Sequence, residues 1–209
     1  MTNDTLQQVQ QASEQWSWDL CGFVSVLCSM SDTGQIQIGH YTREAERRDL
    51  VFSLAVDFVR SIQNTPMASE LQAFTRAVGK GRGYDNWTVS GFVNQSSTPS
   101  THANLTTFGI GMTPAAVIEF FAYMKTAATG RKAQSPAVSM TPYPSFANCI
   151  IGVGTGIYTQ PYDGLKHWVY SPDGNSVYTW GMEYPGKPED IVGTIVPGCV
   201  VTHKIRIPT

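Results

Sequence analysis

Two residues in this sequence have the types and settings of a nucleophile and its base. Cys21 lies in EQWSWDLCGFVSVL, where a Trp-rich segment turns into an apolar run, and His167 opens the β-forming run KHWVYS. A helix N-terminus favours the thiolate form of a cysteine, and an imidazole from another element can take the thiol proton. The pair therefore predicts a thiol nucleophile activated by histidine. The alternative is a buried structural thiol with an incidental strand histidine.

Helical signals fill most of the first 130 residues. Apolar residues recur at helical spacing, and Thr113, Pro114 and Gly130 are typical of an N-cap, a first helical residue and a helix end. We predict helices over about residues 5–16, 20–30, 42–63, 66–78 and 114–129. The Ser-, Thr- and Asn-rich segment 83–111 is predicted to be loop with some strand.

Strand signals follow residue 130. Four runs rich in β-branched and aromatic residues predict strands: CIIGVGTGIYT, KHWVYS, SVYTWGMEY and VVTHKIRI. The segment SPDGNS between the second and third runs is typical of a hairpin turn. We therefore predict an α+β fold with a single domain over residues 1–209, mainly helical over about 1–130 and β-rich over about 131–209.

Charge and composition exclude several classes of partner. The 209 residues carry a net charge of −2 and only 14% charged residues, without a basic run, so no nucleic acid is expected as a partner. No stretch approaches the ~18 to 20 apolar residues of a membrane span. The polar start lacks the apolar core of a signal peptide, so we expect synthesis in the cytoplasm without classical secretion.

Cysteine and glycine spacing indicates neither a metal nor a cofactor. The four cysteines have no CxxC spacing and no neighbouring pair of histidines, which predicts no metal site. Four cysteines in 209 residues are too few for a disulfide framework, so the thiols are predicted to be reduced. The glycine-rich run Gly152–Gly156 lacks the Lys-Ser/Thr pair of a phosphate-binding loop, so no nucleotide cofactor is expected.

Both candidate segments resemble those of a known superfamily. The run QWSWDLCGFVSVL, with Gln15 six residues before Cys21, resembles the nucleophile segment of papain-like cysteine peptidases, and DLCGFVSVL is also similar to NlpC-type cell-wall peptidases. The run LKHWVYSPDGNSVYTWG resembles the histidine strand, hairpin and following strand of the same superfamily. The resemblance implies a papain-like fold, in which a helical lobe with the nucleophile helix precedes an antiparallel β-sheet lobe. It also implies that Gln15 and the Cys21 N–H form an oxyanion hole.

The residue that orients the histidine departs from the family pattern. An Asn or Asp is expected near the end of the strand after the histidine, but the hairpin places Thr179, Trp180 and Gly181 opposite His167. Glu183, just beyond them, is the nearest carboxylate that could take this role. Otherwise a backbone carbonyl or a water orients His167, or the site is a dyad.

Four further residues near the two motifs are expected to line the substrate cleft. They are Trp18, Gly22, Trp168 and Trp180. Tryptophans on both sides of the nucleophile suit an extended chain laid across a cleft. They could equally form the interface between the two lobes.

The resemblance implies a thiol-dependent amide hydrolase, a cysteine peptidase or amidase. Its substrate would be a peptide bond of a protein, the side-chain amide of Gln, or a stem peptide of peptidoglycan. Bacterial effectors of this superfamily are delivered by dedicated secretion systems, which would imply an inhibitor or immunity protein as a further partner. Two alternatives stay open: a non-catalytic binding module on the same fold, and a Gln deamidase or transglutaminase-like enzyme.

Overall fold

The structure of the chain is a computed structural model, and it describes residues 19–36, 44–95, 109–130, 138–139 and 145–208. The helices are α2 Cys21–Asp32, α3 Glu44–Ile62, α4 Pro66–Val78, α5 Val89–Gln95, α6 Pro114–Thr129 and α7 Pro188–Ile195, with the 3₁₀ turn η2 Pro161–Gly164. The strands are β1 Val138–Ser139, β2 Ala147–Gly154, β3 Leu165–Asp173, β4 Ser176–Thr179, β5 Met182–Pro185 and β6 Val200–Arg206.

The strands form one sheet in the order β1-β6-β2-β3-β4-β5, and every neighbouring pair is antiparallel. Helices α2 to α6 precede the sheet in the chain, and α7 lies between β5 and β6. The predicted α+β class with an antiparallel sheet is therefore confirmed. The predicted helix at 5–16 lies outside the described residues.

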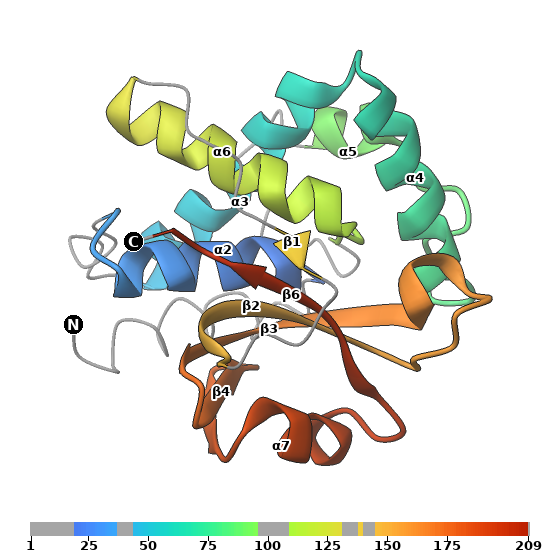
Figure 1. Cartoon of the computed structure of the whole chain (residues 1–209). Coiled ribbons are helices and arrows are strands. Elements are labelled where there is room, and N and C mark those ends of the chain that lie inside the picture. Colours follow the sequence, from blue (N-terminus) through green and yellow to red (C-terminus); the bar gives the residue numbers. More distant parts are fainter. Residues whose placement is uncertain (1–18, 37–43, 96–108, 131–137, 140–144, 209) are drawn as a thin grey trace.

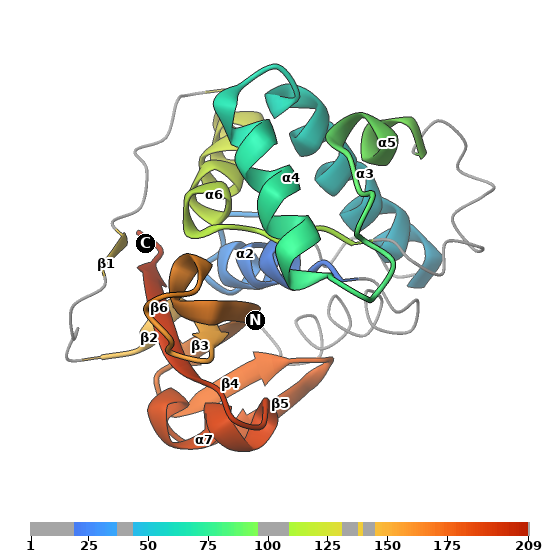
Figure 2. The same ribbon diagram turned by 90° about the vertical axis from the view of Figure 1, so that its right-hand side faces the viewer.

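Each face of the sheet is covered by its own helices. Helix α2 lies directly against the sheet with the other early helices beyond it, and α7 lies on the opposite side (Figures 1 and 2). Alternate residues of the strands supply the two apolar clusters. Ile150, Trp168 and Tyr170 face the helices, whereas Ile151 and Val169 pack with α7. The alternation follows from the period of two along a strand.

Several predicted helix boundaries are confirmed, and local chemistry explains them. The Thr113 side chain accepts a hydrogen bond from the Ala116 N–H at the start of α6, and Gly130 ends the helix in the left-handed conformation at φ 67°. Helix α4 likewise begins at Pro66 and is followed by Gly79, as predicted.

The expectation of loop and strand over 83–111 was wrong for part of the segment. Residues 89–95 form helix α5. The Thr88 hydroxyl accepts a hydrogen bond from the Gly91 N–H, which caps the first turn. Val89, Phe92 and Val93 are buried at spacings of three and four residues, so helical burial outweighed the β-forming composition.

Two strand predictions need correction, and one helix was missed. The run 149–159 is strand only to Gly154, and the run 176–184 is two strands, β4 and β5, separated by Trp180 and Gly181. Both of these residues have positive φ, 49° and 69°, as a tight two-residue hairpin turn requires. Helix α7 was not predicted, although Pro188 at its first position and two acidic residues in its first turn are helix-start signals.

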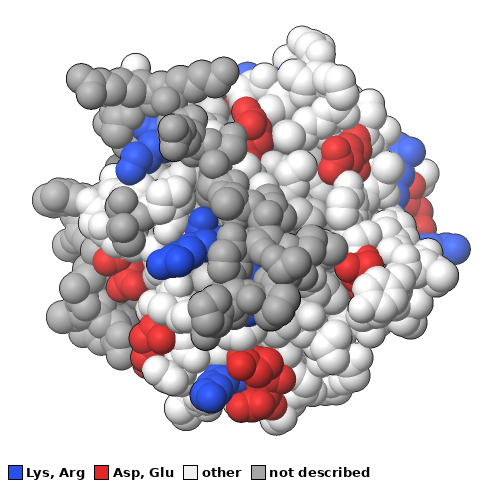
Figure 3. Space-filling model, viewed as in Figure 1, with Lys and Arg blue, Asp and Glu red and all other residues white. Residues whose placement is uncertain are grey.

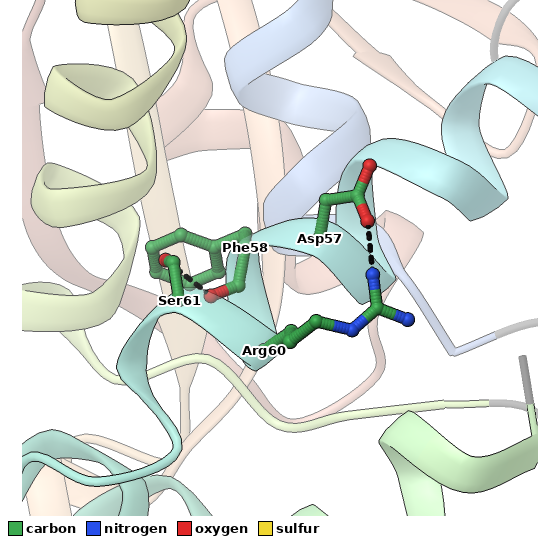
Figure 4. Close-up of polar contacts among 4 residues, drawn as sticks. All are labelled: Asp57, Phe58, Arg60 and Ser61. Atoms are coloured by element: carbon green, nitrogen blue, oxygen red, sulfur yellow. Dashed lines mark hydrogen bonds and ion pairs between the residues drawn. The ribbon is translucent and has the colours of Figure 1, made fainter.

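Helix α3 shows how an apolar stripe and a polar face share one helix. Phe58 is fully buried, and its ring contacts Phe23 of α2 and Phe120 of α6 edge-on. On the outer face, Arg60 forms an ion pair with Asp57, and the Ser61 hydroxyl donates to the Phe58 carbonyl (Figure 4).

Charged side chains are dispersed over the face of the molecule seen in Figure 3. Among the described residues drawn there, the acidic and basic groups are scattered in small separate groups. None of the helices in the described ranges is both long and apolar enough to cross a membrane.

Candidate active site

A cavity of about 610 Å³ lies where α2, α4 and strands β3 and β4 meet. Its lining includes both residues singled out by their chemistry, Cys21 and His167. The fold therefore brings two residues that are far apart in the sequence to one cavity.

Cys21 is the first residue of α2 and is partly exposed. Backbone N–H groups at a helix start have no partner within the helix. The backbone N–H groups of Trp168, Gly22 and Cys21 itself lie close enough to the sulfur to favour its thiolate form. Because Trp168 directly follows His167, strand β3 passes beside the thiol.

The thiol is nevertheless protonated at neutral pH. Burial, the largest cause, and the nearby Asp19 carboxylate raise the pKa of Cys21, the three N–H groups lower it, and the net result is a pKa of about 11. The thiolate-favouring effect expected at the helix N-terminus is therefore present, but desolvation outweighs it.

The imidazole of His167 is fixed by β4 and by the turn that follows. Its Nε2 hydrogen-bonds with Thr179 Oγ1 at 2.6 Å. Its ring stacks on Trp180, with centroids 4.9 Å apart and planes 27° apart. Burial lowers the pKa of His167 to about 4, so the ring is neutral at neutral pH.

The Thr179 hydroxyl occupies the position beside His167 Nε2 for which Glu183 was considered. Glu183 lies on β5, and its carboxylate accepts a hydrogen bond from the Tyr178 hydroxyl. The hairpin expected from the sequence put Thr179, Trp180 and Gly181 opposite His167, and none of the three is Asn or Asp. What the sequence analysis did not weigh is that a hydroxyl can hydrogen-bond an imidazole nitrogen as an amide or carboxylate does.

The residues expected to line the cleft have different surroundings. The Trp180 side chain lines the cavity and is 39% exposed. The Trp168 indole is buried and donates to the Met112 carbonyl at 2.8 Å, so its side chain ties β3 to the helices. Gly22 has no side chain, which allows the backbone of α2 to pack closely against the Met112 side chain. Gln15 and Trp18 lie outside the described residues.

The sequence analysis missed a polar cluster on the cavity wall. The Tyr84 hydroxyl donates to the Asp19 carboxylate at 3.0 Å, and the Arg82 guanidinium lies 3.5 Å from the same group. Burial, followed by the charge of Asp19, raises the pKa of Tyr84. The signal available was the carboxylate two residues before Cys21, whereas nothing in the sequence near Tyr84 pointed to the site.

Comparisons of the chain with models of known families, with curated proteins and with solved structures gave no match.

The described residues contain no metal site of the usual kind. Over the residues that the structure describes, no group of three or more His, Cys, Asp and Glu side chains is arranged to hold a metal ion. None of the four cysteines forms a disulfide.

Proposed function

We propose that this protein is a thiol-dependent amide hydrolase on a papain-like fold, with Cys21 as nucleophile and His167 as its base. One observation carries the proposal: Cys21 and His167 line the same cavity, and the backbone N–H of Trp168, the residue after His167, lies close enough to the Cys21 sulfur to lower its pKa. The order of nucleophile helix and then antiparallel sheet supports it, as does the resemblance of both segments to papain-like cysteine peptidases.

In the proposed reaction, the Cys21 sulfur attacks the carbonyl carbon of a substrate amide. With Nε2 held by Thr179, Nδ1 is the nitrogen of His167 that takes the thiol proton. The carbonyl π electrons move to oxygen, and the Cys21 N–H with the Gln15 amide stabilises the oxyanion. His167 then gives its proton to the leaving nitrogen as the C–N bond breaks, which leaves a thioester.

Hydrolysis of the thioester returns the enzyme to its starting state. His167 takes a proton from water as the water oxygen attacks the thioester carbon. The S–C bond breaks, the acid product leaves, and the proton passes back to sulfur. Because thiol and imidazole are both neutral at rest, proton transfer accompanies the attack rather than preceding it.

The proposed substrate is an amide in an extended peptide, either a peptidoglycan stem peptide or a segment of a target protein. The exposed aromatic face of Trp180 beside His167 gives such a chain an apolar surface. A bacterial effector delivered by a dedicated secretion system, and countered by an immunity protein, would act on substrates of this kind.

Expression in a bacterial host, with and without a periplasmic export signal, tests the proposal. Lysis only on export would identify a peptidoglycan substrate, and toxicity only without export would identify a cytosolic target. In either case Cys21→Ala should abolish the effect. The matched control is Cys28→Ala, which removes a buried thiol from the same helix and should leave the effect intact. Toxicity that survives Cys21→Ala would contradict covalent catalysis by this thiol.

A binding module is the second candidate, and the neutral state of the resting pair favours it. A thiol with a pKa of about 11 beside an imidazole with a pKa of about 4 holds no thiolate at neutral pH. If the protein acts by binding alone, Cys21→Ala and His167→Gln will both keep its effect on the host.

A further inference from the structure

We propose that Thr179 is the positioning residue of the Cys21–His167 pair. In this assignment its hydroxyl oxygen accepts the Nε2–H of His167, which keeps Nδ1 free of a proton and ready for the thiol. Being uncharged, the hydroxyl also leaves the pair neutral until a substrate is attacked. The assignment rests on the proposed function for its catalytic consequence, but its structural content can be measured without a substrate.

The contact itself supplies the first argument. The distance of 2.6 Å between Nε2 and Oγ1 is that of a strong hydrogen bond, and Thr179 is only 4% exposed. Trp180 stacks on the ring and so restricts its rotation. The imidazole is therefore held by one polar contact and one aromatic face.

Proton placement supplies the second argument. A neutral imidazole has one N–H and one bare nitrogen. If Thr179 donated to Nε2, the proton would sit on Nδ1 and His167 could not accept the thiol proton there. Only the tautomer in which Nε2–H donates to Thr179 lets the ring act as base toward Cys21.

Charge supplies the third argument. An orienting carboxylate stabilises an imidazolium by its charge, and a hydroxyl cannot. The titratable groups lining the cavity with His167 are Asp19, Cys21, Arg82, Tyr84, Lys166 and Tyr178. Among the described residues, burial is the cause that lowers the pKa of His167. The hydroxyl of Thr179 brings no charge that would oppose this effect of burial on His167. This is consistent with a resting pair in which the thiol and the imidazole are both neutral.

Three variants of Thr179 test the assignment by NMR of the His167 ring nitrogens. The unchanged protein should show the Nε2–H tautomer. Thr179→Val keeps the shape but loses the hydroxyl, and should give a mixture of tautomers, whereas Thr179→Ser should keep the parent state. Thr179→Asp should move the titration of His167 up by about one to three pH units, the effect of an opposite charge at close range.

The rate of amide hydrolysis supplies a second measurement. Thr179→Val should lower kcat by about 10- to 100-fold with little change in KM, the range known for the hydrogen-bond partners of metal-ligating histidines, because in both cases the ring loses the contact that orients it. Thr179→Ser should recover most of that loss.

The outcomes separate this assignment from the proposed function. A parent protein with its proton on Nδ1, or Thr179→Val with an unaltered tautomer and titration, would overturn the role of Thr179 whatever the activity. If the NMR results are as expected while Cys21→Ala keeps the effect on the host, the positioning is right and the hydrolase proposal is wrong.

Discussion

At the scale of the residue, the site is a thiol and an imidazole that burial keeps uncharged. Desolvation raises the pKa of Cys21 to about 11 and lowers the pKa of His167 to about 4, so each group is held in its neutral form. Three N–H groups at the sulfur oppose this effect. These donors would stabilise the negative charge that remains on sulfur when the thiol loses its proton.

Alkylation of Cys21 by iodoacetamide should therefore depend steeply on pH. Only the thiolate reacts, and with a pKa of about 11 its fraction rises about tenfold for each pH unit between 7 and 10. The measurement is the rate of modification at Cys21, followed by mass spectrometry of peptides, with the Cys21→Ala protein as control. A rate that levels off below pH 8 would show that the resting thiol is already ionised.

The Gln15 side chain is expected to stabilise the oxyanion. Gln15→Ala should lower kcat by about 10²–10³-fold, the loss typical of one oxyanion donor, with folding intact. Gln10→Ala, in the same polar segment, is the control. An unchanged rate on a working substrate would show that the six-residue spacing from Gln15 to Cys21 is a coincidence.

Residue types predicted the pair but not its full environment. Cys21 stood out because an apolar helix begins there, and His167 because it opens a strand. Hairpin spacing put Thr179 near His167 but did not predict its hydrogen bond to Nε2. The Asp19–Tyr84 contact depends on side chains that meet across the fold, which spacing along the chain does not encode. Burial, which determines both pKa shifts, likewise depends on the whole fold.

At the scale of the element, α2 is positioned by a close approach at its second residue. A Cβ on Gly22 would lie 2.7 Å from the Met112 sulfur and 2.9 Å from its Cβ. The Met112 carbonyl also accepts the indole N–H of Trp168. Gly22 thus lets the start of α2 pack against Met112, which is also hydrogen-bonded to Trp168 of β3.

Gly22→Ala should destabilise the fold by about 1–3 kcal/mol, because the added methyl overpacks this contact. The free energy of unfolding in urea measures the loss. In a Met112→Ala background, which removes the sulfur and Cγ contacts but keeps the Cβ contact, the same substitution should cost less, a difference that a double-mutant cycle isolates. Equal costs in the two backgrounds would mean that Met112 does not restrict this position.

Elements with clear boundary residues were predicted well, and those defined by tertiary packing were not. Thr113 and Gly130 bound α6 as expected. Helix α5 was missed because a segment of Trp, Thr and Val favours strand until its apolar residues are seen to pack on one side. The turn between β4 and β5 was missed because Trp180 adopts positive φ, which is rare for a large side chain.

At the scale of the whole molecule, a helical layer and a sheet meet at the cavity, and of the two histidines in the described residues His203 is buried and His167 is partly buried. Burial lowers the pKa values of both His167 and His203, the latter against an opposing effect of Asp163. A histidine with a lowered folded-state pKa stabilises the fold above its unfolded pKa of about 6.5. That stability is lost as the pH falls, because the unfolded chain then binds protons that the folded chain does not.

The free energy of unfolding should therefore fall between about pH 6.5 and pH 4, with His167 accounting for up to about 3 kcal/mol of the loss. Urea unfolding at pH 7 and pH 4.5 measures it, and His167→Gln should reduce the difference between the two values. If the parent and the variant lose equal stability, His167 is not held neutral in the folded protein.

The central claim is that Cys21 and His167 act together as one pair, and bridging them chemically tests it most directly. A short bifunctional alkylating agent, 1,3-dibromoacetone, reacts first with a thiol and then with a nucleophile within a few ångströms of it. At pH 9, peptide mapping should find one three-carbon bridge between the Cys21 sulfur and the His167 ring. The His167→Gln protein should carry the reagent on Cys21 alone. If the unaltered protein also carries it singly on Cys21, or bridged to another residue, the two side chains do not form a catalytic pair.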